Sequence, residues 1–196
     1  MSAVTQLAPA ILYLHGFCSS PASWKVRLLA AALDSRGQRD RLFCPALSHV
    51  PVEAMAQAEA IIAAQRGRPL TLVGSSLGGY YATWLAEKHD LRAVLINPAV
   101  VCSLDPEMFI GTQTNLYSGE SFEFTAEHIA QLAALEAPRI TPERYLLLVE
   151  TGDEVLDYRQ ALTRYAGCHQ IVLDGGDHSF TRFPDLLPQL FEYCGL

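Results

Sequence analysis

The sequence predicts a single domain of the α/β class, in which a mostly parallel sheet of about six strands carries helices on both faces. Short apolar runs bounded by glycine, proline and polar residues alternate with longer stretches of helical period, which is typical of a parallel sheet covered by helices. Half of the 196 residues are hydrophobic and 18% are charged, as in one compact globular unit. We find no internal repeat or linker, so we expect one domain over residues 1–196.

Strands and helices are expected in alternation along the chain. Each predicted strand is a short, mainly apolar run that ends at a turn: 10–14 (AILYL), 41–44 (RLFC), 70–73 (LTLV), 93–96 (AVLI), 145–149 (YLLLV) and 170–173 (QIVL). Each predicted helix has apolar residues three and four positions apart: 21–35, 52–65, 77–89, 126–135, 158–165 and 185–193. The stretch between 96 and 145 contains only one such helix, so we expect an insertion at about 102–138.

Charge and cysteine content exclude several classes of function. The formal net charge is −7, which disfavours binding to nucleic acids and to anionic membranes. The first ten residues place no lysine or arginine ahead of an apolar run, and no apolar run is long enough to span a bilayer, so we expect a cytoplasmic protein without membrane insertion. The five cysteines lack metal-ligand spacing and are expected to be reduced thiols; neither a metal nor another cofactor is predicted.

The strongest motif is G-x-S-x-G at Gly74–Gly78, placed between a predicted strand and a predicted helix. In such a turn the central residue, Ser76, is lifted above the end of the sheet as a nucleophile, and side chains two positions before and after it would collide. Gly74 and Gly78 occupy those positions. The N–H of Leu77, at the start of the helix, is a candidate oxyanion donor. Ser75 is the competing hydroxyl, which we expect to pack or to cap.

A second loop at the carboxyl end of the first strand contains His15, Gly16, Phe17 and Cys18. In folds of this kind the second oxyanion donor comes from this loop, so the N–H of Phe17 is our candidate, and the residue type there should be free. His15 is an alternative base, but we favour a structural role in the loop. Cys18 is expected to pack, because the nucleophile position is already taken by Ser76.

The acid and the base are expected on loops after late strands, in the chain order Ser, Asp or Glu, His. His178 follows the strand 170–173 and is the candidate base. Asp153 follows 145–149 and a glycine, and is the candidate orienting carboxylate. Glu150, Glu154 and Asp157 compete for that role, and Asp157 better fits a helix N-cap. Asp177, next to His178 in the chain, is expected to be solvated or bound within its loop.

With these residues, the chain resembles the YqiA-type esterases of Gram-negative bacteria, within the α/β-hydrolase fold. The matching blocks are 13–17 with 19–21, 74–79, 97–99, 151–159 and 175–178. The resemblance implies hydrolysis of short acyl esters or acyl thioesters, with Ser76, Asp153 and His178 as the triad. The sequence departs from the family at Cys18 and Asp177, where asparagine is expected. Because both lie beside the site, they bear on substrate preference.

The insertion at about 102–138 is expected to form a short lid over the acyl side of the site, with Phe109, Phe122 and Phe124 as candidate lining of an acyl pocket. The alternative is that these rings complete the core. The function favoured by the sequence is a serine esterase acting on a small-molecule acyl ester or thioester. An acyltransferase with the same triad, or a non-catalytic binding protein of the same fold, remain alternatives, and the sequence does not indicate an oligomeric state.

Overall fold

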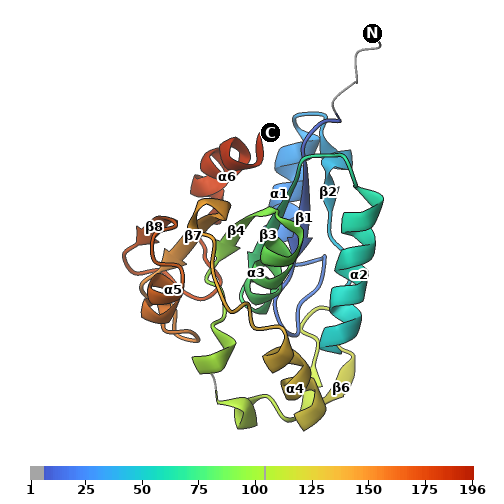
Figure 1. The fold of residues 1–196 in the computed structure, drawn as a ribbon, viewed down its shortest axis with the longest axis vertical. Helices are drawn as coiled ribbons and strands as arrows, with labels where there is room; N and C mark the ends of the chain where they lie inside the picture. The colour runs from blue at the N-terminus through green and yellow to red at the C-terminus, as the bar shows by residue number, and fades with distance from the viewer. Residues whose placement is uncertain (1–6, 104) are drawn as a thin grey trace.

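The centre of the computed structural model, which describes residues 7–103 and 105–196, is a six-stranded sheet in the order β2-β1-β3-β4-β7-β8 (Figure 1). Each strand runs parallel to its neighbours. The strands are β1 (Ala10–Leu14), β2 (Leu42–Phe43), β3 (Leu70–Ser75), β4 (Arg92–Ile96), β7 (Tyr145–Glu150) and β8 (His169–Leu173). The chain moves outward from β1 to β2 and then returns to β3 on the other side of β1. The carboxyl ends of β1 and β3 therefore flank the switch point at which such sheets bind ligands.

Helices cover both faces of this sheet. On one face, α1 (Trp24–Asp34) and α6 (Leu187–Cys194) pack with the alternate strand residues that include Ile11 and Tyr13. On the other face, Leu12 and Leu14 pack with α2 (Pro51–Ala64), α3 (Leu77–His89), α4 (Ala126–Ala134) and α5 (Tyr158–Arg164). Because the central strands are buried on both faces, their sequences are apolar runs without alternation. The expected fold class is confirmed.

Short 3-10 helices complete the connections. They are η1 (Arg39–Arg41), η2 (Val101–Ser103), η3 (Pro106–Met108), η4 (Pro142–Arg144) and η5 (Phe183–Leu186). They account for most of the differences from the expected boundaries. The second strand is shorter than 41–44 because Arg41 belongs to η1, and the expected helix 185–193 divides into η5 and α6. The first helix begins at Trp24 rather than at residue 21, because Ser23 closes a turn by donating to the carbonyl of Ser20.

The insertion contains an antiparallel hairpin that the sequence patterns did not predict. Its strands are β5 (Gly111–Thr114) and β6 (Ser121–Phe124), which pair with each other and not with the main sheet. The hairpin and α4 lie at the end of the molecule opposite α6 and the C-terminus (Figure 1). That is the end at which the main strands finish, so the insertion stands over their carboxyl ends. In the ranges described, no helix has the length and apolarity needed to cross a bilayer.

Candidate active site

Ser76 occupies a sharp turn between β3, which ends at Ser75, and α3, which begins at Leu77. Its backbone has φ 55° and ψ −124°, a strained conformation for a residue with a side chain. A Cβ atom on Gly74 would overlap the carbonyl of Gly78, and one on Gly78 would overlap the carbonyl of Leu14. The first glycine therefore lets the turn close. The second lets the end of β1 approach α3. The sequence had suggested instead that side chains at the two glycine positions would collide with each other.

A continuous chain of hydrogen bonds connects Ser76, His178 and Asp153. The Nε2 atom of His178 lies 3.1 Å from the Oγ atom of Ser76, and its Nδ1 atom lies 2.8 Å from Oδ2 of Asp153. The Asp153 side chain is 2% exposed, and its other oxygen accepts the N–H groups of Val155 and Leu156 at 2.9 and 2.8 Å. Since a carboxylate only accepts, Nδ1 of the neutral ring carries the proton and Nε2 faces the serine hydroxyl as a base.

The three competing carboxylates bind backbone or arginine groups instead of the imidazole. Glu150 is fully buried and accepts from Arg182 at 2.7 Å and from the N–H of Asp177 at 2.8 Å. Glu154 accepts the N–H of His178 at 2.9 Å, which lowers the pKa of that carboxyl. Asp157 accepts from the N–H of Arg159 and caps α5, as expected. Of the four, only Asp153 contacts the imidazole.

Two residues that the sequence did not indicate as functional form hydrogen bonds with the loop that carries His178. Asn97, at the end of β4, donates to the carbonyl of Asp177 at 3.1 Å and accepts the N–H of Glu150 at 3.0 Å. Lys25, in the first turn of α1, donates to the carbonyl of Ser179 at 2.8 Å. Asn97 lies in a block that matched the family, whereas nothing in the sequence marks Lys25. The His178 loop is thus tied to both β4 and α1.

The oxyanion candidates lie on the two loops that meet at Ser76. A Cβ atom on Gly16 would lie 3.2 Å from Cβ of Ser76, so the first loop passes directly beside the serine. Within residues 7–103 and 105–196, the N–H groups of Phe17 and Leu77 have no hydrogen-bond acceptor. Leu77 is also the first residue of α3, at the positive end of the helix dipole. Both groups are available to bind a developing negative charge.

The side chain of Phe17 is not free to vary, contrary to expectation. Its ring makes edge contacts with three rings of the insertion, Phe109, Phe122 and Phe124, with centroid distances of 5.9, 6.0 and 5.0 Å. The hairpin tip adds two hydrogen bonds to the same loop. The N–H of Leu116 donates to the carbonyl of Cys18 at 2.8 Å, and the Asn115 side chain donates to that of Ser19 at 2.9 Å. The insertion therefore fixes the loop that carries one of the oxyanion candidates.

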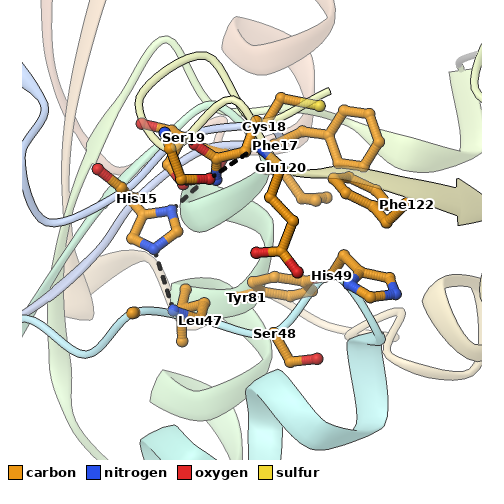
Figure 2. A pocket seen from close by; sticks show the side chains of 16 residues that line it. His15, Phe17, Cys18, Ser19, Leu47, Ser48, His49, Tyr81, Glu120 and Phe122 are labelled. Carbon is orange, nitrogen blue, oxygen red and sulfur yellow. Dashed lines mark hydrogen bonds between the residues drawn. The ribbon is translucent and has the colours of Figure 1, made fainter. Parts of the chain in front are cut away.

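Three cavities adjoin these residues, and we name them by their character. The apolar cavity, about 220 Å³, is lined by Ser76, His178, Phe109 and Phe124 together with aliphatic side chains. The hairpin cavity, about 310 Å³, lies below the loop of Phe17 and is lined by Phe122, His49 and Glu120 (Figure 2). The lysine cavity, about 170 Å³, is lined by Ser76, His178 and Lys25. Of the three phenylalanines expected in one pocket, Phe122 lines a different cavity from the other two.

His15 connects two loops and does not reach the serine. Its Nε2 atom accepts the N–H of Leu47 at 3.1 Å, and Nδ1 donates to the carbonyl of Gly16 at 3.1 Å (Figure 2). Burial lowers the pKa of His15, so the ring stays neutral in this arrangement. In the part of the chain that the structure describes, no group of three or more His, Cys, Asp or Glu side chains is arranged to hold a metal ion.

Comparison with known proteins places this geometry in a family and a fold. The model of a family described as "Uncharacterised protein family (UPF0227)" matches residues 10–195. A protein of Agrobacterium vitis S4 superposes with a TM-score of 0.74 at 19% identity, over 95% of this chain and 88% of that one. The mouse alpha/beta hydrolase domain-containing protein 10 superposes with a TM-score of 0.70 at 18% identity, over 98% of this chain and 90% of that one. The esterase domain of a Rhodothermus marinus protein superposes with a TM-score of 0.64 at 19% identity, over 94% of this chain and 84% of that one. At these identities the similarity shows the α/β-hydrolase fold.

Proposed function

Because the chain belongs to the UPF0227 family and has the α/β-hydrolase fold, we propose that it is a serine hydrolase that cleaves small acyl esters or acyl thioesters. The family match confirms the resemblance found in the sequence. The observation that carries the proposal is the hydrogen-bonded chain from Ser76 through His178 to Asp153. The similar domain of Rhodothermus marinus is described as an esterase domain, which is the same class of reaction.

The geometry supports a two-step reaction. In the first step Nε2 of His178 takes the proton of Ser76, whose oxygen attacks the acyl carbonyl, and the N–H groups of Phe17 and Leu77 bind the resulting oxyanion. His178 then gives its proton to the departing alcohol or thiol, leaving an acyl ester on Ser76. In the second step His178 takes a proton from water, which attacks this ester, and His178 then returns the proton to the oxygen of Ser76 as the acid is released. Asp153 orients the ring throughout.

The apolar cavity is the proposed site of the acyl chain. It reaches Ser76 and His178, and its walls include Phe109, Phe124, Ile129 and other apolar side chains. An acyl group placed there would leave its carbonyl near Ser76. Its volume, about 220 Å³, favours short chains.

The test is covalent labelling and turnover of two serine variants. Ser76→Ala should abolish labelling by a fluorophosphonate probe and lower kcat for an aryl ester on the order of 10³-fold or more, because it removes the nucleophile. Ser75→Ala is the matched control and should retain labelling. Product analysis with water as the only acceptor separates hydrolysis from acyl transfer. Labelling that persists in Ser76→Ala and disappears in Ser75→Ala would overturn the assignment.

A further inference from the structure

The lysine cavity meets the apolar cavity at the proposed nucleophile. Both are lined by Phe17, Ser76 and His178, so one substrate bound at Ser76 could extend into each. Their chemical character differs. The apolar cavity has aliphatic and aromatic walls, whereas the lysine cavity is lined by hydroxyl groups, two histidines and Lys25, and no aspartate or glutamate is among its lining residues.

Lys25 is a buried cation with few partners. Its residue is 9% exposed, and its ammonium donates to the carbonyl of Ser179 at 2.8 Å. Among the described residues it forms no ion pair. The ring of Trp24 also lies near the ammonium, with its centroid 5.7 Å from Nζ, but a ring face is not a conventional hydrogen-bond acceptor, so donors of the ammonium remain for a ligand. A buried charge is stable only when it is paired or hydrogen bonded, which makes an anionic ligand favourable here.

The start of α1 adds further donors at the same place. Ser23 and Trp24 line the cavity, and the side chain of Ser23 makes no capping hydrogen bond. The first backbone hydrogen bond of the helix is made by the N–H of Arg27, so the N–H groups of residues 24–26 have no helical acceptor. They carry the positive end of the helix dipole.

A buried hydroxyl points independently to a polar ligand in the cavity. Tyr13, 1% exposed, is among the lining residues. Its hydroxyl has Ser75 as a polar neighbour, but among the described residues it has no hydrogen-bond partner of ordinary geometry. A buried hydroxyl without a partner costs free energy that a bound acceptor recovers.

Two of the carboxylates around Lys25 bind other groups, and the third, Asp177, has a buried Oδ1 atom without a hydrogen-bond partner among the described residues but forms no ion pair with the lysine. Asp153 binds His178, and Glu150 binds Arg182. Asp177 interacts with Lys25 electrostatically but does not line the cavity. Burial lowers the pKa of Lys25 to about 8, and Asp177, Glu150 and Asp153 oppose that shift. The ammonium is therefore mostly charged at neutral pH.

We propose that the lysine cavity binds a carboxylate carried by the leaving group of the substrate, with Lys25 as the residue that recognises it. This inference rests on the proposed function and specifies its substrate class: an ester or thioester whose alcohol or thiol part ends in a carboxylate. The cavity, about 170 Å³, is close to a cavity of about 150 Å³ that accepts a benzene ring, so the leaving group is the size of one ring or a short chain.

The experiment compares two esters that differ in one charge, 4-(butanoyloxy)benzoate and its methyl ester, with each kcat/KM divided by the rate of uncatalysed hydrolysis. The wild-type protein should favour the anionic ester by about tenfold or more, as expected for a desolvated charge-assisted contact. Lys25→Met should bring the ratio near one, and Lys25→Arg should restore part of it. Lys88→Met, which removes an exposed lysine paired with Glu59, is the control and should keep the wild-type ratio.

Each other outcome overturns a separate statement. If the wild type hydrolyses both esters equally well, or the preference survives in Lys25→Met, the lysine cavity does not bind the carboxylate and the proposed function stands. If a mono-aryl succinate, with the carboxylate on the acyl side, is preferred instead, the leaving-group assignment is wrong. If neither ester is hydrolysed, the proposed function fails. The carboxylate site is then tested by calorimetric titration of wild type and Lys25→Met with 4-hydroxybenzoate. Equal binding to the two proteins, or no binding to either, overturns the carboxylate site.

Discussion

Strained residues gather around the candidate site. Five non-glycine residues in the described ranges have positive φ, and four of them, Cys18, Ser76, Asn97 and Phe180, lie on the loops that carry or adjoin the site. Such conformations persist only where the surrounding structure imposes them. Here the constraints are the glycine contacts at Ser76, the hairpin bonds around Cys18 and the hydrogen bonds of Asn97.

The strain at Cys18 leads to a prediction. Its φ of 52° lies in the left-handed region, which asparagine tolerates better than cysteine. Cys18→Asn should therefore raise the free energy of unfolding by about 0.5–1 kcal/mol, measured by urea denaturation. Cys18→Val is the control and should lower it, because a β-branched residue fits that region poorly. A loss of stability in the asparagine variant would show that packing of the thiol outweighs the backbone strain.

The buried carboxylate of Asp153 predicts a sharp difference between two aspartates. In Asp153→Asn an amide N–H can face Nδ1 of His178, which then places the ring proton on Nε2 and removes the base. We expect kcat for an aryl ester to fall on the order of 10⁴-fold. Asp157→Asn should retain most of the activity, since asparagine also caps a helix. Similar losses in two folded variants would contradict the assignment.

The buried ammonium of Lys25 predicts how stability depends on pH. Its pKa in the folded protein is about 8, against an ordinary value of 10.5. Between these values the unfolded chain holds a proton that the native protein has released, so stability rises with pH through this window. The penalty for the buried charge is fully present at pH 7, where both states are protonated.

Lys25→Met removes that penalty, so its stability relative to wild type should be greater at pH 7 than at pH 10, by about 2 kcal/mol. Urea denaturation of both proteins at the two pH values measures this difference. Asp177, Glu150 and Asp153 interact electrostatically with the ammonium, and all three are present in both proteins that are compared. A difference independent of pH would mean that the lysine is not desolvated.

At the level of the elements, the insertion supplies aromatic rings both to the core and to the wall of the apolar cavity. Phe124 and Phe109 both line the apolar cavity, but Phe124 is 1% exposed and belongs to the core, whereas Phe109 is half-buried. The helix of the insertion was predicted from its period, but the hairpin was not. Its strands have four residues each. β5 (GTQT) has no apolar side chain, and the alternation in β6 (SFEF) has no partner strand with the same pattern, so the sequence did not indicate a hairpin.

The three phenylalanines of the insertion should respond differently to substitution by alanine. Phe109→Ala should shift the preferred acyl chain towards greater length, because it enlarges the apolar cavity. Phe124→Ala should cost roughly 3–5 kcal/mol of stability, as in other buried sites, and because Phe124 also lines the apolar cavity it should shift the acyl preference as well. Phe122→Ala is the control, since its ring lines the hairpin cavity and should leave acyl preference unchanged. Acyl-length profiles and melting temperatures of the three variants decide this, and an unshifted profile for Phe109→Ala would exclude a lid that shapes the acyl site.

Across the whole molecule, the sequence predicted the elements of the fold more completely than the residues of the candidate site. Apolar runs and helical periods located the six main strands and six helices, because local burial determines both patterns. The serine was evident because its turn needs two glycines within five residues. Lys25 was not, because its role depends on a contact between distant parts of the chain. Lys25 meets Ser179 across 154 positions, and no local pattern encodes such a contact.

The distance along the chain between the residues of the candidate site has a consequence for folding. Ser76 and His178 are 102 positions apart, and their loops meet only after β3 and β8 have joined the same sheet. Contacts over such distances form slowly, because the chain must first lose the entropy of a long loop. During refolding, helix formation should therefore precede the proposed hydrolysis, which should begin only when the last strand has docked. The proposed hydrolysis would then report complete folding, because His178 follows β8 in the chain and reaches Ser76 only in the finished sheet.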